Sequence, residues 1–233
     1  MNDLKILSGG AAQGLMERLA PAFKALSGLD VSGEFGAVGA MAAKLREGAP
    51  TDLVILSRAI VDELAGQGLV VKSTATDIGR VETAVAVRVG DATIAVATAD
   101  DLRAALLAAE EIFTPDTRTA TAGIHFAKVL AELGIAEQVT RRLKMFPNGM
   151  TAMRHLSVSS ARRAIGCTQV TEILNTSGVT LIGPLPRGYD LATVYTAAIT
   201  TGASAAGAAR QLIDVLIDPQ HRALRASIGF GES

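Results

Sequence analysis

Short apolar runs alternate with segments of helical periodicity along most of the chain. Asp52–Leu56 is nearly all apolar, as a strand covered on both faces requires. In 205–217, by contrast, apolar residues recur at helical spacing. Such alternation is typical of an α/β fold with largely parallel strands. We expect strands at 4–7, 31–35, 52–56, 83–89, 165–168 and 180–183, another that begins at 112, and an extended segment at 189–199. We expect helices at 12–26, 40–46, 60–67, 99–109, 123–133, 149–157 and 205–217, and a further short helix that ends at 163.

Composition narrows the class of protein. The 233 residues are 49% apolar, which suits one large domain or two lobes of about 100 residues each. The 22 Lys and Arg balance 23 Asp and Glu, so the chain has no general attraction for a polyanion. With six Phe, two Tyr and no Trp it also lacks stacking platforms for single-stranded nucleic acid. We therefore expect no nucleic-acid partner.

Cysteine, histidine and the amino terminus bear on redox chemistry, metals and location. Cys167 is the one cysteine, and the three histidines show no metal-ligand spacing, so we expect no disulfide, no metal and no cofactor. Met1–Leu7 lacks the basic and long apolar regions of a signal peptide, which predicts a cytoplasmic protein. Charged residues interrupt every long apolar stretch, so no membrane span is expected.

Four turns between an expected strand and the next helix are small and contain glycine. In a parallel α/β sheet such turns lie at the carboxyl ends of strands, where ligands bind. Each offers backbone N–H groups and the positive end of a helix dipole, and small side chains let an anion reach them. Turns of this kind also favour glycine for geometry alone, so one by itself is a weak indication. The turns are Ser8–Ala11, Gly36–Gly39, Thr119–Gly123 and Pro147–Gly149.

The nucleotide-binding patterns are absent. No Gly-x-Gly-x-x-Gly with a following acidic residue occurs, and no phosphate loop ends in Gly-Lys-Ser/Thr. Ser8 lies in no Gly-x-Ser-x-Gly elbow, which disfavours acyl transfer. The turns therefore predict binding of a small anion.

Several segments together resemble the molybdate-binding solute receptors of the type II periplasmic binding protein fold. The resemblance covers nearly the whole chain, and its most specific element is Gly-Ala-Pro-x-Asp-Leu at 48–53. It implies two α/β lobes hinged by two crossing strands, near 84–87 and 192–195, with the ligand between the lobes. Lobe one would be 1–84 with 193–233, and lobe two 85–192. The matching segments are Leu4–Ala11, Phe35 with its turn, Arg46–Ile55, Ala122–Ile124, Ile165–Gln169, Asp218–Gln220 and Gly229–Phe230.

The sequence departs from this family at the ligand-binding positions. The family presents a serine hydroxyl in the first turn, where Ala11 stands, and a hydroxyl in the second turn, where Gly36–Gly39 has none. The family's tyrosine near the end of a lobe-two strand is Gln169 here. Arg58 instead follows a strand, where a guanidinium can clamp a carboxylate. These changes favour an organic acid over molybdate.

Three functions remain open. The main hypothesis, by analogy with the aconitate isomerase branch of this family, is an isomerase that shifts an allylic proton of an unsaturated polycarboxylate, with His125 as the base. The alternative is a non-catalytic protein that binds a molybdate-like oxyanion or a carboxylate; a regulatory domain with a separate DNA-binding partner is a third possibility. The oligomeric state stays open. The predicted binding residues are Ser8, Gly9, Gly10, Ala11, Gly39, Arg58, Thr119, Thr121, Ala122, Gly123, Asn148, Gly149 and Gln169.

Overall fold

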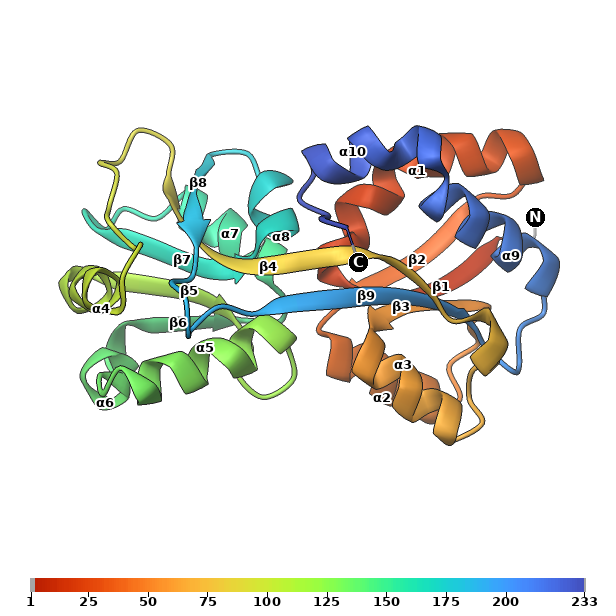
Figure 1. Cartoon of the computed structure of the whole chain (residues 1–233), viewed down its shortest axis with the longest axis horizontal. Helices are drawn as coiled ribbons and strands as arrows, with labels where there is room; N and C mark the ends of the chain where they lie inside the picture. Colours follow the sequence, from red (N-terminus) through yellow and green to blue (C-terminus); the bar gives the residue numbers. More distant parts are fainter. Residues whose placement is uncertain (1–2, 233) are drawn as a thin grey trace. The chain divides into compact units, whose positions relative to one another are not determined.

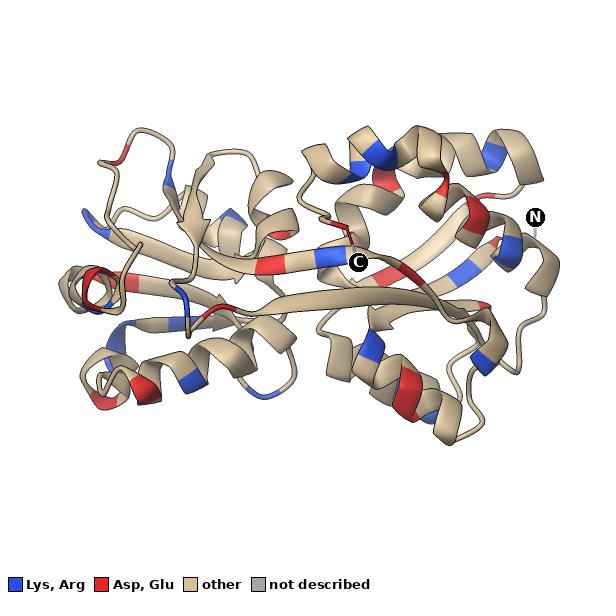
Figure 2. Cartoon of the chain, viewed as in Figure 1, with Lys and Arg blue, Asp and Glu red and all other residues tan. Residues whose placement is uncertain are grey.

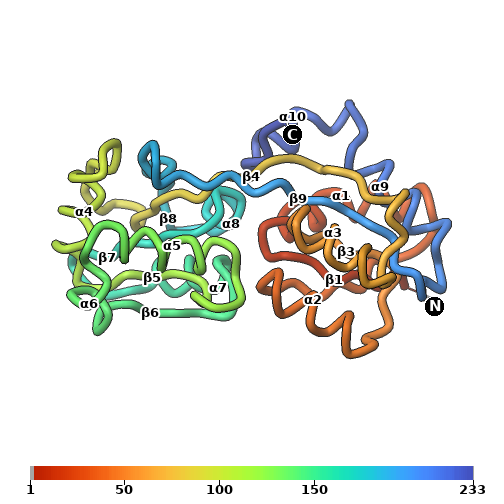
Figure 3. Tube along the Cα trace, turned by 60° about the horizontal axis from the view of Figure 1, so that its bottom comes forward, coloured from red at the N-terminus to blue at the C-terminus, as the bar shows by residue number. Residues whose placement is uncertain are grey.

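The computed structural model describes residues 3–232 and divides the chain into two compact units. Unit 1 contains residues 1–81 and 193–233, and unit 2 contains residues 82–192. Both ends of the chain therefore contribute to unit 1, whereas the middle of the chain forms unit 2 (Figure 3). The chain leaves unit 1 within β4 (Thr76–Arg88) and returns within β9 (Ala192–Ile199).

Unit 1 contains a sheet in which β2, β1, β3 and β9 are adjacent in that order. The first three strands are parallel and β9 is antiparallel to β3, so the carboxyl ends of β1, β2 and β3 share one edge. β3 is buried along its whole length, as its apolar run predicted. The strand bounds are β1 (Leu4–Gly9), β2 (Val31–Gly36) and β3 (Leu53–Ser57).

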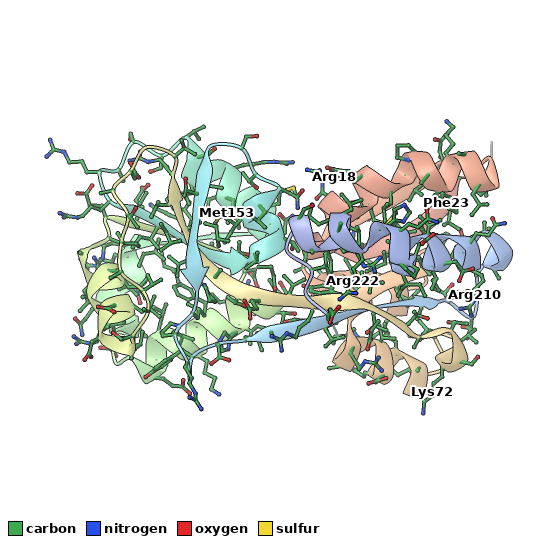
Figure 4. All side chains as sticks on the ribbon, turned by 45° about the horizontal axis from the view of Figure 1, so that its top comes forward. Arg18, Phe23, Lys72, Met153, Arg210 and Arg222 are labelled. Carbon is green, nitrogen blue, oxygen red and sulfur yellow. The ribbon has the colours of Figure 1, made fainter. Side chains whose placement is uncertain are left out.

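Helices cover both faces of the unit 1 sheet (Figure 1). α1 packs against α9, and Phe23 of α1, labelled in Figure 4, is fully buried. α2 and α3 cover the opposite face in Figure 1. The helices of this unit are η1 (Gly10–Ala12), α1 (Gln13–Ser27), α2 (Val38–Arg46), α3 (Arg58–Gly66), η2 (Lys72–Thr74), α9 (Ala206–Ile217), η4 (Pro219–His221) and α10 (Arg222–Ser227).

Unit 2 has a mixed sheet of the same kind. β7, β5 and β6 are parallel, and β4 is antiparallel to both β7 and β8. The carboxyl ends of β5, β6 and β7 therefore lie at one edge, where the loops to the next helices begin. The elements are β5 (Glu111–Pro115), β6 (Leu143–Phe146), β7 (Ala164–Gln169), β8 (Val179–Pro184), α4 (Ala99–Ala108), α5 (Thr121–Glu132), α6 (Ala136–Val139), η3 (Thr140–Arg142), α7 (Gly149–Ser157) and α8 (Val170–Leu174).

The two faces of the unit 2 sheet carry separate hydrophobic clusters. α4, α5 and α6 pack on the face that contains Val85 and Cys167, whereas α7 and α8 pack on the face that contains Ala84 and Ala86. Met153 of α7, labelled in Figure 4, is fully buried in the second cluster. Burial raises the pKa of the Cys167 thiol, so this side chain is an unreactive part of the core.

The mixed α/β fold is confirmed, and most predicted elements are present within a few residues of their expected bounds. The short helix expected to run into Arg163 is wrong, because residues 159–163 form bends and loop. β6 was missed because it is an edge strand with exposed Lys144 and Met145 and lacks a buried strand's apolar run. α8 was missed because it has only five residues.

Charged side chains of both signs are interspersed over the elements of each unit (Figure 2). The formal net charge is -1, and lysine and arginine are not concentrated on one helix or strand (Figure 2). Within residues 3–232, no helix is long and apolar enough to cross a membrane.

Candidate functional site

In unit 1 the predicted first turn, Ser8–Ala11, spans the last two residues of β1 and the first two of η1, and it is buried. Ser8, Gly9, Gly10 and Ala11 are all buried. The Ser8 hydroxyl donates to the carbonyl oxygen of Gly9 at 3.0 Å, so it is committed to the turn. The turn continues through η1 into α1, and neither helix receives a side-chain cap within the described residues. Neither N-cap residue at this helix start therefore supplies a side-chain acceptor for its first N–H groups.

The second turn of unit 1 has the same character. α2 begins after Ala37, which supplies no cap, and Gly39 is its second residue and half-buried. Small residues flank this helix end in the sequence, and its N-cap residue offers the first backbone amides no side-chain acceptor.

In unit 2 the N-terminus of α5 is also uncapped. Its N-cap residue is Ala120, whose methyl group accepts no hydrogen bond; Thr121 is half-buried and Ala122 is buried. Gly123 is needed at the third helical position, because a Cβ there would overlap the backbone oxygens of Pro115 and Asp116. The turn is thus packed so tightly that a side chain at 123 has no room.

Thr119, which was predicted to bind ligand, forms hydrogen bonds within the turn. Its hydroxyl and its backbone N–H both donate to Asp116 Oδ1, at 3.0 and 2.9 Å. The N–H of Arg118 also donates to this oxygen, and together these bonds lower the pKa of Asp116 despite its partial burial. Asp116 therefore fixes the loop that leads into α5.

The second predicted turn of unit 2, Pro147–Gly149, differs, because side chains of the protein fill the N-terminus of α7. Asn148 Oδ1 accepts the N–H of Thr151 at 2.8 Å. The buried carboxylate of Glu172 accepts the N–H of Gly149 at 3.1 Å and the hydroxyl of Thr168. Both residues predicted here, Asn148 and Gly149, are thus engaged within the unit.

Burial raises the pKa of Glu172, and hydrogen bonds oppose that shift. The donors are the hydroxyl of Thr168 and the backbone N–H groups of Gly149, Gln169 and Met150. Gly149 is required for this arrangement, because a Cβ would overlap both the Glu172 carboxylate and the Thr168 hydroxyl.

A carboxylate also fills the N-terminus of α9. Buried Asp52, from the Gly-Ala-Pro-x-Asp-Leu element, accepts the N–H groups of Ser204 and Ala205 at 2.8 and 2.9 Å. Its second oxygen accepts the N–H of Lys5 at 2.9 Å. The most specific element of the resemblance is therefore structural, since it joins β1 and α9 to the start of β3.

The pKa of Asp52 makes this role testable. Burial acts to raise that pKa, but the bonds from Lys5, Ala205 and Ser204 outweigh it and lower the pKa below its usual value of 3.8. A carboxylate with a lowered pKa contributes stability above its ordinary pKa and loses it as the pH falls through the folded-state pKa. We expect Asp52→Asn to reduce the free energy of unfolding by about 2–3 kcal/mol at pH 7. In urea titrations, the difference in free energy of unfolding between wild type and Asp52→Asn should become smaller below about pH 4. Asp62→Asn, at an exposed residue, is the control. A difference that does not change with pH would contradict this account.

Arg58 is the first residue of α3, as expected for a residue that follows a strand. Its guanidinium forms an ion pair with Asp77 in which Nε donates to Oδ1 at 3.0 Å and Nη2 contacts Oδ2. Thr196 donates to the same Asp77 oxygen at 2.6 Å. The Arg58 side chain is 46% exposed, which leaves its remaining N–H groups toward solvent.

His125 and Gln169 occupy different environments in unit 2. His125 is half-buried on α5, and its Nε2 lies 2.7 Å from the carbonyl oxygen of Tyr189. A carbonyl only accepts, so Nε2 carries the hydrogen and Nδ1 is the nitrogen that remains for a base. Gln169 is buried at the end of β7, where it is the N-cap residue of α8.

Sequence reasoning missed the roles of Glu172 and Asp77. Glu172 follows a buried strand by three residues, but its partner Gly149 lies 23 positions away, so the local sequence does not show their contact. Asp77 gave no signal for the same reason, because its partners Arg58 and Thr196 are distant in sequence.

Unit 1 also contains a cavity of about 610 Å³ beside α10. Asp77, Arg222, Arg225 and Phe230 are among its lining residues. Arg225 donates to the carbonyl oxygens of Leu216 and Asp218, so it fixes the end of α9. None of the residues predicted to bind ligand lines this cavity.

No metal centre is evident in the part of the chain that the structure describes. No group of three or more His, Cys, Asp or Glu in residues 3–232 is placed to hold a metal ion.

These features define a class of protein: two α/β units whose parallel strands end in small turns with uncapped helix N-termini are typical of type II periplasmic binding proteins. Residues 4–231 match the family model of the bacterial extracellular solute-binding proteins, and the chain belongs to that family. The family predicted from the sequence is thereby confirmed.

Solved structures agree with this assignment. The periplasmic molybdate-binding protein of Azotobacter vinelandii has a TM-score of 0.81 at 19% identity, covering 99% of this chain and 100% of that one. The sulfate-binding protein SubI of Mycobacterium tuberculosis has a TM-score of 0.75 at 20% identity, covering 99% of this chain and 86% of that one. At these identities the likeness establishes the fold.

A curated relative is an enzyme. The aconitate isomerase of a Pseudomonas species is 24% identical over 223 residues, covering 93% of this chain and 82% of that protein.

The predicted cytoplasmic location is wrong. It rested on the composition of the first residues, whereas the family and the molybdate-binding neighbour are extracellular and periplasmic proteins. Family membership over 4–231 is the stronger observation.

Proposed function

We propose that this chain is a solute-binding protein for a small anion, an oxyanion or a small carboxylate. One observation carries the proposal: α1, α2 and α5 each begin after the carboxyl end of a strand, among small residues, without a side-chain cap. α3 and α8 likewise receive no cap from their N-cap residues, whereas α4 has the capping box of Thr98 and Asp101 and α7 is capped by Asn148. Helix ends that the chain leaves open at its ligand-binding edges are suited to hold an anion through N–H groups and the helix dipole.

The predicted binding residues of these turns fit this function. In unit 1 they are Ser8–Ala11 and Gly39, which supply backbone amides. In unit 2 they are Thr121–Gly123, at the start of α5. The hydroxyl groups of Ser8 and Thr119 are committed to their turns, so backbone amides rather than side chains are the main donors we propose.

The test is ligand screening by thermal shift and calorimetry with molybdate, tungstate, sulfate, cis-aconitate and trans-aconitate. A ligand present at 100 times its Kd should add about 2.7 kcal/mol to the free energy of unfolding. We expect at least one of these anions to do so while chloride at equal ionic strength does not. Absence of any specific shift across the panel would refute the proposal.

Arg58 provides a prediction that separates a carboxylate ligand from an inorganic oxyanion. If the free N–H groups of Arg58 bind a carboxylate, Arg58→Ala should weaken carboxylate binding by about tenfold or more, as loss of a charge-assisted hydrogen bond does. Arg46→Ala is the matched control, because Arg46 also pairs with a carboxylate, that of Glu63, in the same unit. Equal affinity of wild type and Arg58→Ala in calorimetry would remove Arg58 from the site.

A second candidate function is isomerisation of aconitate, which the Pseudomonas relative favours. Here the same amides would stabilise the negative charge that develops on the substrate, and His125 Nδ1 would act as the base. Proton NMR in deuterated water distinguishes the two functions. A new isomer, or deuterium at an allylic carbon, supports the enzyme; binding without exchange supports the receptor.

A further inference from the structure

The N-terminus of α7 is an exception among the helix ends that follow strands in unit 2. α5 begins without a cap, whereas α7 has two acceptors: Asn148 for the N–H of Thr151 and Glu172 for the N–H of Gly149. Glu172 is 4% exposed and belongs to a different helix, so sequence proximity does not explain its position.

The Glu172 carboxylate has no acceptor capacity left over. A carboxylate offers about four lone-pair positions. Four donors face it: the hydroxyl of Thr168 and the N–H groups of Gly149, Met150 and Gln169. A group with all its lone pairs engaged has none to accept a substrate proton, so Glu172 is unsuited to be the base of a reaction.

The donors around Glu172 are those that a bound anion would use. Two of them are the first N–H groups of α7, and anions bind at such helix ends. Asp52 uses the same device in unit 1, where its carboxylate accepts N–H groups at the start of α9. The structure therefore contains a buried carboxyl group of the protein at a helix end in each unit.

We propose that Glu172 is a positioning residue: its carboxylate replaces a ligand anion at the N-terminus of α7, orders the turn that joins β6 to α7, and restricts ligand binding in unit 2 to the N-terminus of α5. The statement about α5 rests on the proposed function, whereas the occupation of α7 does not. Gly149 has no room for a Cβ beside this carboxylate, so the position of Glu172 requires a glycine at 149.

The experiment is chemical rescue of Glu172→Ala by formate. The variant lacks the carboxylate but keeps the N–H donors, so formate can occupy the vacated position. We expect a lower Tm for Glu172→Ala, and a rise of about 3 °C or more when formate is added at several times its Kd for the opened site. Chloride at equal ionic strength should give no such rise, and formate should raise the Tm of wild type by less than it raises that of Glu172→Ala.

Two further variants keep the test decisive. Glu137→Ala, an exposed glutamate of the same unit, is the control and should show no rescue. Glu172→Gln preserves the size of the side chain but offers one oxygen fewer, and it serves if the alanine variant does not fold. It should be less stable than wild type, because the amide nitrogen cannot accept the hydrogen bonds that the carboxylate oxygen accepted. Equal responses of the Glu172 variants and of wild type to formate, or stability of Glu172→Gln equal to wild type, would overturn the assignment.

The consequence for ligand binding is measured separately. With the N-terminus of α7 opened in Glu172→Ala, sulfate and molybdate affinities should rise at least threefold in calorimetry. Formate rescue without this rise would leave the occupation of α7 intact and count against the proposed ligand-binding role of the unit 2 turns. A rise without rescue would show that the carboxylate does not occupy the helix end.

Discussion

Gly123→Ala is expected to destabilise the protein by about 3 kcal/mol, because the new methyl group would overlap two backbone oxygens. Those oxygens belong to Pro115 and Asp116, at the end of β5, and backbone atoms cannot turn aside as the end of a long side chain can. The start of α5 must then move away from the strand. For a chain of this size the loss corresponds to a fall in Tm of about 6–12 °C.

The same variant tests the site. If the amides at the start of α5 hold an anion, their displacement should weaken ligand binding by about tenfold or more, since an error of about 1 Å in a positioned group is costly. Gly207→Ala is the matched control: Gly207 lies in α9 and has open space around it, so alanine there should leave binding unchanged and stabilise the helix by up to about 1 kcal/mol. Equal stability of Gly123→Ala and wild type would contradict the close packing.

The fold could be predicted from the sequence because the spacing of apolar residues indicates which positions are buried. The buried run of β3 and the spaced apolar residues of α9 are where the pattern predicted them. Elements with little burial carry little of that signal, and the exposed edge strand β6 was accordingly missed. The hydrophobic pattern does not show which strands pair. In the structure β9, which is distant from β3 in the sequence, lies antiparallel to it.

The candidate site was only partly accessible to sequence reasoning. Small turns marked the helix ends correctly, because an open N-terminus needs small neighbours. Which ends are already occupied depends on acids that are distant in sequence: Asp52 reaches α9 across 152 positions, and Glu172 reaches Gly149 across 23. A carboxylate's partner at such separations is a tertiary property, so the sequence did not show that Asn148 and Gly149, which were predicted to bind ligand, form hydrogen bonds within the turn.

Ala120→Asp should have opposite effects on stability and on function. Ala120 is the N-cap residue of α5, with extended backbone angles and no hydrogen bond from its side chain. Aspartate is among the best N-cap residues and adds about 1 kcal/mol when it replaces alanine. Its carboxylate would accept the N–H groups that we propose bind the ligand, just as Glu172 does at α7. Ligand affinity should therefore fall by about 100-fold, through competition for donors and repulsion between like charges.

Ala120→Asn separates these two causes. Asparagine caps as well as aspartate but carries no charge, so it should stabilise α5 and reduce affinity less than aspartate does. Val89→Asp adds an exposed charge in the same unit and should leave both quantities nearly unchanged. Unaltered calorimetric affinity in both Ala120 variants, with stability retained, would show that the ligand does not use the N-terminus of α5. A loss of affinity together with a gain in stability would mean that this chain leaves a helix end unsatisfied because the ligand completes it.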